Sequence, residues 1–271
     1  MICLLTERRQ FDEFLPDFLQ DPEFSDPHLH TQDQLACNLY GALQKPNDLV
    51  LGVYEDGRMT GLFVFLVLRE ERYLEMIVGL SRSAAAYREV LELLRACWQG
   101  FQADFVFNPR NPLIRDCLIA RGADFDPEQH KMVLAEPRTV SDTEGITLLS
   151  ERYFPEYAAM HSTNVYWTAE KVVRATDRFR VLLAIEDGHV AGYLDVTTKY
   201  EENEFYDLFV RKESRRRGWA RKLISMAIAL NRPKGLMLLV DADNPPAIRL
   251  YASMGFAEDP GGATQTATWM I

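Results

Sequence analysis

The chain lacks the residue patterns from which disulfide networks and metal sites are usually built. Its 271 residues include four cysteines and five histidines. The cysteines form no CxxC pair, and no two histidines are four residues apart, as they would be in a helical zinc site. We therefore expect no disulfide and no metal, and we expect the cysteines to be buried as small apolar residues.

Long apolar runs and an excess of positive charge are also missing. No stretch approaches the roughly 20 apolar residues that span a bilayer, and the first residues, MICLLTERRQ, lack the apolar run of a signal peptide. The net charge of -10 argues against non-specific binding to nucleic acid and favours cationic partners. We expect a cytoplasmic protein that binds neither nucleic acid nor membrane.

The sequence contains an internal duplication. Three matches occur in the same order in both halves: residues 2–8 with 146–152, residues 53–61 with 184–192, and Asn111-Pro112 with Asn244-Pro245. A polar stretch at 136–145 lies between the copies and is typical of a linker. The sequence therefore predicts two domains, at residues 1–137 and 145–271.

Both halves alternate strand-like and helix-like segments, which indicates a mixed α/β sheet. In the second half, the Asp187-Gly188 turn signal predicts a hairpin between strands at 181–185 and 190–196. The elements expected after it are a strand at 205–210, a helix at 220–230, a strand at 236–240 and a helix at 245–254.

A basic cluster, RRRGWARK at 215–222, lies between the predicted strand at 205–210 and the helix that follows. A strand-to-helix loop presents unpaired backbone N–H groups at the positive end of the helix dipole, so it binds phosphate. Gly218 allows the backbone to approach closely, and Ala220 keeps its position small. The alternative interpretation of this basic cluster is an ordinary solvated helix terminus.

The segment Arg215 to Ala220 resembles the pyrophosphate loop of the GCN5-related N-acetyltransferase (GNAT) family. Asn244, Leu250-Tyr251 and Gly255-Phe256 occupy the places of the family's downstream Asn, Leu-Tyr and Gly-Phe. The resemblance implies two tandem acyl-CoA N-acyltransferase folds, and the second copy carries the chemistry.

The first half resembles the same fold without its loop. Residues 83–88, SAAAYR, stand where the second copy has Arg215 to Ala220, and Leu118 stands where it has Tyr251. We therefore expect the first copy to be catalytically silent.

The resemblance implies an acyltransferase that moves an acetyl group from acetyl-CoA, its cosubstrate, to a primary amine of a small molecule or peptide. The residues implied in cofactor binding are Phe209 or Val210 as backbone donor to the oxyanion, Arg215, Arg216, Arg217, Gly218, Trp219, Ala220 and Arg221 around the pyrophosphate, and Asn244. Asn244 is equally suited to cap a helix that begins at Pro245.

The implied catalytic acid is Tyr251, since a phenol with a pKa of about 10 suits protonation of a thiolate. Glu204 and Asp207 are candidate bases, with water as the alternative, and either carboxylate could instead be structural. His161, Tyr166 and Trp167 could line an amine pocket or belong to the core.

The sequence leaves a second function class open, namely a CoA-dependent sensor or partner-recruiting module without turnover. It does not choose among polyamines, aminoglycosides, lysine side chains and peptide N-termini as acceptors. A monomer and a homodimer are both compatible with it.

Overall fold

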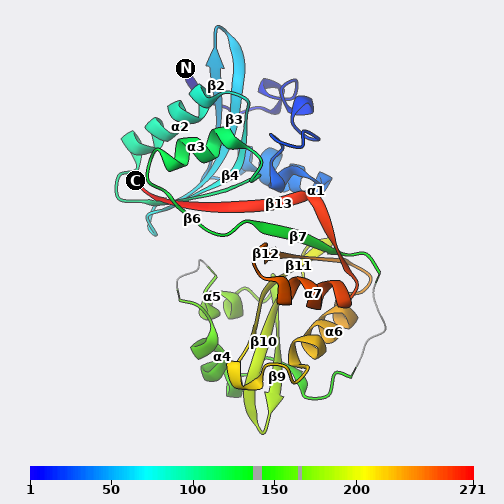
Figure 1. The fold of residues 1–271 in the computed structure, drawn as a ribbon. Coiled ribbons are helices and arrows are strands. Elements are labelled where there is room, and N and C mark those ends of the chain that lie inside the picture. Colours follow the sequence, from blue (N-terminus) through cyan, green and yellow to red (C-terminus); the bar gives the residue numbers. More distant parts are fainter. Residues whose placement is uncertain (137–141, 164–166) are drawn as a thin grey trace. The chain divides into compact units, whose positions relative to one another are not determined.

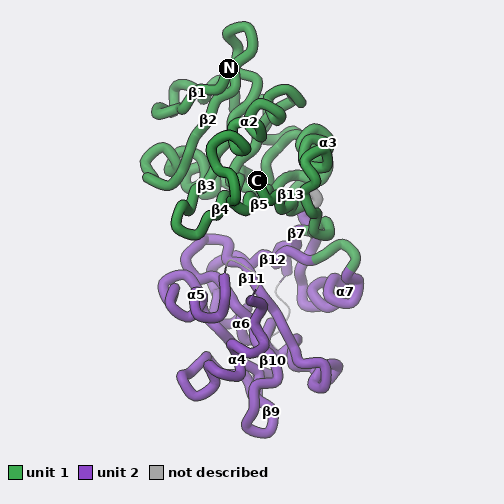
Figure 2. The backbone as a smooth tube through the Cα atoms, turned by 90° about the vertical axis from the view of Figure 1, so that its left-hand side faces the viewer, with its two compact units in different colours: residues 1–130, 241–243, 260–271 green, residues 131–240, 244–259 purple. Residues whose placement is uncertain are grey.

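The computed structural model describes residues 1–136, 142–163 and 167–271, so Tyr166 and residues 137–141 of the predicted linker lie outside the described part. The chain forms two compact units (Figure 2). Unit 1 comprises Met1–His130, Asp241–Asp243 and Pro260–Ile271, and unit 2 comprises Lys131–Val240 and Asn244–Asp259. Each unit is a mixed α/β structure, as predicted.

The sheet of unit 1 has helices on both faces (Figure 1). Its strands follow the order β1 (Ile2–Leu4), β2 (Asp48–Glu55), β3 (Arg58–Leu68), β4 (Tyr73–Ser81), β5 (Gln102–Phe107) and the end of β13 (Phe256–Met270), with β6 (Asp124–Phe125) also on β13. One face carries α2 (Ala84–Cys97) and α3 (Pro112–Ile119). The other carries short helices: η1 (Arg8–Gln10), η2 (Leu15–Asp17), η3 (Pro27–Leu29), α1 (Gln32–Gln34), η4 (Leu35–Tyr40) and η5 (Gly41–Gln44).

Unit 2 repeats this arrangement. Its strand order is β7 (Gln129–Leu134), β12 (Gly235–Asp241), β11 (Glu202–Val210), β10 (His189–Thr197), β9 (Phe179–Glu186) and β8 (Ile146–Leu148). One core of unit 2 forms around α4 and α5, and the other forms around α6 and α7. The helices are η6 (Glu151–Tyr153), α4 (Phe154–Met160), α5 (Ala169–Arg174), η7 (Lys212–Ser214), α6 (Trp219–Asn231) and α7 (Pro245–Ser253).

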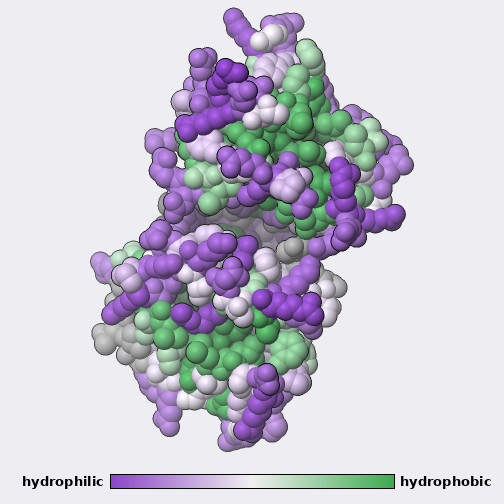
Figure 3. Space-filling view, turned by 180° about the vertical axis from the view of Figure 1, so that it is seen from behind, coloured by the Kyte–Doolittle hydropathy of each residue, from purple (hydrophilic) through white to green (hydrophobic). Residues whose placement is uncertain are grey.

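Alternation along the strands divides each sheet between two cores. In β3, Phe63 and Phe65 pack with α2, whereas Leu62 and Val64 pack with the N-terminal helices. In the view of Figure 3, hydrophobic residues gather over each unit and hydrophilic residues surround them. The buried apolar clusters of each unit are built from that unit's own strands and helices.

The two units exchange the last strands of the duplicated halves. β7 ends the first half, but its residues from Lys131 belong to unit 2, where Met132 is buried in the α6 core. The end of β13 closes the second half, but it pairs antiparallel with β5 in unit 1, with Gln265 opposite Phe107. The predicted boundaries at 1–137 and 145–271 follow chain order and do not contain this exchange.

Local predictions for the second half are confirmed. The hairpin of β9 and β10 turns at Asp187 and Gly188, whose φ angles of 51° and 82° suit a type I′ turn. Asp56 and Gly57 repeat this turn in unit 1, with φ angles of 49° and 78°. The expected burial of the cysteines is wrong for Cys37 and Cys97, which lie on exposed helical faces.

Candidate active site

Strands β11 and β12 separate part-way along their length. Their parallel pairing runs from Glu202 opposite Gly235 to Phe205 opposite Leu238 and then stops, although both strands continue. A bulge at Asp195/Val196 in the pairing of β10 with β11 lies at the same level. The edge of β11 from residue 206 to 210 is therefore open on the side where β12 would continue.

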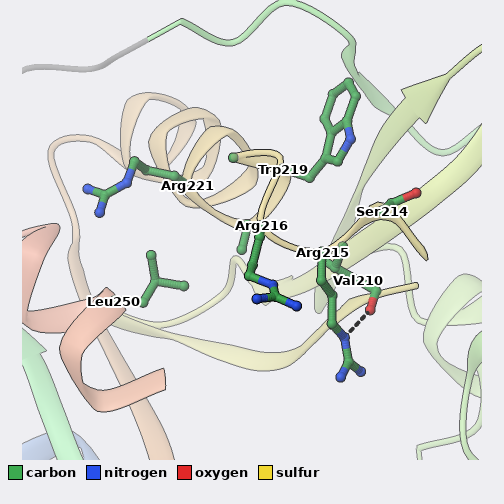
Figure 4. A pocket seen from close by; sticks show the side chains of 9 residues that line it. Val210, Ser214, Arg215, Arg216, Trp219, Arg221 and Leu250 are labelled. Carbon is green, nitrogen blue, oxygen red and sulfur yellow. Dashed lines mark hydrogen bonds between the residues drawn. The ribbon is translucent and has the colours of Figure 1, made fainter. Parts of the chain in front are cut away.

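A pocket of about 210 Å³ lies where β11 ends and α6 begins (Figure 4). It is lined by Val210, Ser214, Arg215, Arg216, Gly218, Trp219, Ala220, Arg221 and Leu250. Of the implied cofactor-binding residues, the structure thus brings seven together here and leaves Phe209, Arg217 and Asn244 outside the lining. Ser214 and Leu250 also line the pocket, although neither was among the residues implied in cofactor binding.

The floor of this pocket is the start of α6. Gly218 caps the helix in the left-handed region, with φ of 89°, and offers no side-chain cap to the first-turn N–H groups. Arg216 also has a positive φ, of 62°, which is uncommon for a residue with a side chain. The first turn contains no acidic residue, so the positive end of the helix dipole remains available to an anion.

The three consecutive arginines point in different directions. Arg215 donates from Nε to the Val210 carbonyl at 3.0 Å, whereas Arg217 Nη1 lies 2.6 Å from Glu186 Oε1. The indole of Trp219 also donates to Glu186, at 3.2 Å, and points away from Leu250 in Figure 4. Arg216 lines the pocket without an ion pair to any residue that the structure describes. Within the cluster, Arg217 therefore stabilises the loop, whereas Arg216 faces the pocket.

Glu186, at the end of β9, holds this loop in place and was not indicated by the sequence. Besides Arg217 and Trp219, it accepts the hydroxyl of Ser214 at 2.7 Å. These hydrogen bonds, Ser214 first, lower the pKa of the Glu186 carboxyl and keep it ionised. The loop's shape thus depends on a carboxylate from the neighbouring hairpin.

The open strand edge identifies which peptide groups face the pocket side. The carbonyl of Phe209 turns toward β10, since it lies 2.5 Å from where a Cβ of Gly192 would stand. The Val210 carbonyl instead accepts the Arg215 side chain. Because peptide groups alternate along a strand, Leu208 and Val210 present their N–H groups to the opening and Phe209 does not.

Asp207 and Tyr251 lie near this opening. Asp207 follows the last β11–β12 pair, its side chain is 36% exposed, and it accepts the Tyr193 hydroxyl at 2.6 Å. Burial, with the nearby charge of Asp207, raises the pKa of Tyr251 to about 12, so the phenol stays protonated at neutral pH. Glu204 lies within the paired part of β11, opposite Met237.

Behind Asp207 is a buried polar cluster. His161 Nε2 lies 3.0 Å from Asp195 Oδ2 and 3.9 Å from Asp207 Oδ2, and Tyr157 donates to Asp195 at 2.9 Å. Burial alone would lower the pKa of His161, but the hydrogen bond to Asp195 and its charge, together with the Ser162 carbonyl and the charge of Asp207, raise it overall. Burial also raises the pKa of Asp195, so the pair retains its shared proton to higher pH. His161 thus supports Asp207 from inside the core.

Asn244 and Trp167, for which the sequence allowed either a functional or a structural role, both have structural contacts. Asn244 caps α7, accepting from the Ala247 N–H at 3.2 Å, and Asn111 caps α3 in the same way. The ring of Trp167 packs edge-on against Phe179, 5.0 Å between centroids.

Unit 1 retains the strand separation but not the two aspartates beside it. Pairing of β4 with β5 ends at Met76 opposite Phe105, and the bulge recurs at Val64/Phe65. At this bulge, Val64 opposite Val78 replaces Asp195 opposite Asp207.

The loop of unit 1 is also shortened. β4 ends at Ser81 and α2 begins at Ala84, whereas residues 211–218 connect β11 to α6. The predicted one-to-one correspondence of residues 83–88 with Arg215 to Ala220 is therefore wrong. Ser83 and Gly218 are the N-cap residues of their helices, so Ser83 corresponds to Gly218 and not to Arg215.

Comparison with known proteins identifies the second copy. Residues 145–256 match the family model of the acetyltransferase (GNAT) family. This segment therefore resembles a GNAT domain. That family uses acetyl-CoA as cosubstrate, so the match supports an acetyltransferase in general. A search of curated proteins found no match.

Solved GNAT structures share the fold over most of the chain. A GCN5-related N-acetyltransferase from Sphaerobacter thermophilus has a TM-score of 0.60 at 16% identity, covering 82% of this chain and 80% of its own. One from Kribbella flavida has a TM-score of 0.57 at 17% identity, covering 86% and 92%. A tandem GNAT protein from the clavulanic acid biosynthesis pathway has a TM-score of 0.52 at 17% identity, covering 85% and 86%. These matches are consistent with two GNAT folds in tandem.

Two features are absent from the described part of the chain. No group of three or more His, Cys, Asp or Glu side chains there could hold a metal ion. None of its helices is both long enough and apolar enough to cross a membrane.

Proposed function

We propose that unit 2 is an N-acetyltransferase that transfers an acetyl group from acetyl-CoA to a primary amine of a small molecule or peptide. The observation that carries the proposal is the pocket at the start of α6, which adjoins the open edge of β11. Asp207 and Tyr251 near that edge supply the base and the acid. We further propose that the enzyme acts in the cytoplasm, as a monomer or homodimer.

The pocket suits the pyrophosphate of the cosubstrate. The first-turn N–H groups of α6 and the side chains of Arg216 and Arg221 would meet its negative charge. The Arg215 side chain would give up its hydrogen bond to the Val210 carbonyl and donate to a phosphate oxygen instead. Arg217 and Glu186 would act indirectly, by fixing the loop.

The reaction assigned to this site is direct aminolysis of the thioester. The amine nitrogen, deprotonated by Asp207, forms a bond to the acetyl carbon, and the oxyanion is stabilised by the N–H of Leu208 or Val210. The carbon–sulfur bond then breaks, and Tyr251 protonates the departing thiolate. The proton taken up by Asp207 leaves to solvent through its exposed side, and the second proton lost by the amine nitrogen returns to Tyr251.

We assign the base to Asp207 in preference to Glu204 because Asp207 lies beyond the last β11–β12 pair. Unit 1 has Leu118 in place of the acid and Val78 in place of the base, which favours a structural role. The correspondence of Leu118 with Tyr251 follows from the equivalent caps Asn111 and Asn244.

Calorimetry with acetyl-CoA, followed by thiol release with polyamines, aminoglycosides, lysine peptides and peptide N-termini, tests the proposal. For Tyr251→Phe we expect thiol release to fall roughly 100-fold with little change in acetyl-CoA affinity. Absence of acetyl-CoA binding would contradict the proposal. Binding without thiol release for every amine would instead favour a CoA-dependent sensor or recruiting module.

A further inference from the structure

Strand β4 of unit 1 has the same open edge as β11. After the pair Met76–Phe105 it continues to Ser81 without β5 beside it. Backbone N–H and C=O groups along such an edge need partners when they are buried. The partners in unit 1 are side chains of the chain itself.

The two open edges can be matched residue by residue. Both strands have the same bulge and the same final pair with the next strand. On this register Gly79 corresponds to Leu208, and Ser81 corresponds to Val210. The N–H of Gly79 is therefore the counterpart of the N–H that Leu208 offers to the acyl oxygen in the proposed mechanism.

Asp26 occupies that N–H. Its Oδ2 accepts from Gly79 N at 2.7 Å, across 53 residues of sequence, and the residue is 2% exposed. Its Oδ1 accepts from His28 N at 2.8 Å and caps η3. A carboxylate forms a stronger hydrogen bond with an amide than a neutral carbonyl does.

His28 occupies the next outward group of β4. Its Nδ1 lies 2.9 Å from the Ile77 carbonyl, and since a carbonyl only accepts, Nδ1 carries the proton. Asn38 donates to the His28 carbonyl at 3.0 Å and fixes the segment.

Tyr87 covers the remainder of the edge. Its hydroxyl lies 3.4 Å from the Gly79 carbonyl and 3.5 Å from the Ser81 carbonyl. Asn111 donates to this hydroxyl at 2.9 Å, and Tyr87 is 2% exposed. The carbonyls of Ile77, Gly79 and Ser81 and the N–H of Gly79 are thus engaged.

We propose that the Asp26–His28 segment is a built-in occupant of the acyl-binding edge of unit 1, in which the Asp26 carboxylate takes the place of the acyl oxygen. The chain then binds a single acetyl-CoA, in unit 2. This last statement rests on the proposed function. The occupant is covalently attached, so its effective concentration is high, and displacing it would leave a buried carboxylate without partners.

Amide hydrogen exchange by NMR tests the occupancy within one molecule, with Leu208 as the matched control for Gly79. We expect Gly79 to exchange at least tenfold more slowly than Leu208 in the free protein. Saturating acetyl-CoA should slow Leu208 and leave Gly79 unchanged. Equal exchange in the free protein, or a response of Gly79 to acetyl-CoA, would overturn the inference.

Two variants refine this test. Asp26→Ala should accelerate exchange at Gly79 about tenfold, while Asp26→Asn, which retains a side-chain oxygen, should have a smaller effect. Equal rates in both variants and the wild type would contradict the assignment. If Asp26→Ala does not fold, the comparison of Gly79 with Leu208 in the wild-type protein still decides.

Calorimetry gives an independent readout. We expect one acetyl-CoA per chain, and no residual binding in Gly218→Asp, which alters the loop of unit 2 alone. Two sites per chain, or binding that survives Gly218→Asp, would contradict a closed unit 1. If the wild type binds no acetyl-CoA, the proposed function fails, whereas slow exchange at Gly79 would still support the built-in occupant.

Discussion

The carboxylate of Glu186 lies 2.6 Å from the guanidinium of Arg217 and directs it away from the pocket that the neighbouring Arg216 lines. Two adjacent arginines of one motif therefore lie in different surroundings. One stabilises the loop through a carboxylate, and the other is available to an anion.

Arg216→Gln is expected to weaken acetyl-CoA binding about tenfold, since a hydrogen bond to a charged group is worth roughly 1.5–3 kcal/mol. Arg217→Gln removes an ion pair whose arginine side is 59% exposed, so its effect on affinity should be smaller, about threefold or less. Calorimetry on both variants makes the comparison. A larger loss for Arg217→Gln would reverse the assignment.

Asp207→Asn should lower the rate of thiol release by about 100-fold or more, because it removes the base and leaves the shape of the site intact. Glu204→Gln, in the paired part of β11, is the matched control and should retain most of the activity. Both are measured with an amine found in the acceptor panel. Comparable losses in the two variants would argue against Asp207 as the base.

The His161–Asp195 pair should make stability depend on pH. Because the pKa of His161 is raised in the folded state, its contribution is fully present below the unfolded pKa of about 6.5 and is lost as pH rises through the folded value. The raised pKa of Asp195 acts in the same direction. Urea unfolding from pH 6 to 8 should show a shallower decline for His161→Gln than for the wild type, and parallel declines would refute this coupling.

The last residues of the chain should stabilise unit 1. Trp269 is 6% exposed in the core of α2 and α3, so Trp269→Ala should cost about 3–5 kcal/mol. The neighbouring Met270 is 65% exposed, and Met270→Ala should change stability by less than about 0.5 kcal/mol. Chemical unfolding, monitored through the amide NMR signals of unit 1, measures the stability change in both variants. Equal stability changes would contradict the strand exchange.

Features set by a few adjacent residues could be predicted from the sequence. Asp187-Gly188 specifies its turn through backbone angles, and Gly218 specifies the start of α6 through its left-handed conformation. The duplication was visible because both halves retain these local signals. Asn244 before Pro245 correctly indicated where α7 begins.

Features that depend on distant pairing could not be predicted in this way. The alternation around Trp269 suits a strand in either sheet, so it does not identify β5 as the partner. Asp26 reaches Gly79 across 53 residues, and no local pattern marks that contact. Glu186 belongs to the turn motif, and its role in the loop appears only when β9 and α6 are folded together.

The strand exchange has a consequence for how the protein is made. β5, at Gln102–Phe107, pairs with residues 265–270, which are synthesised long after it. The half that is translated first therefore cannot complete its sheet until residues 265–270 have been synthesised as well. The first copy would be retained under this arrangement whatever its own chemistry, because its strand β7 forms part of the unit that carries the pocket.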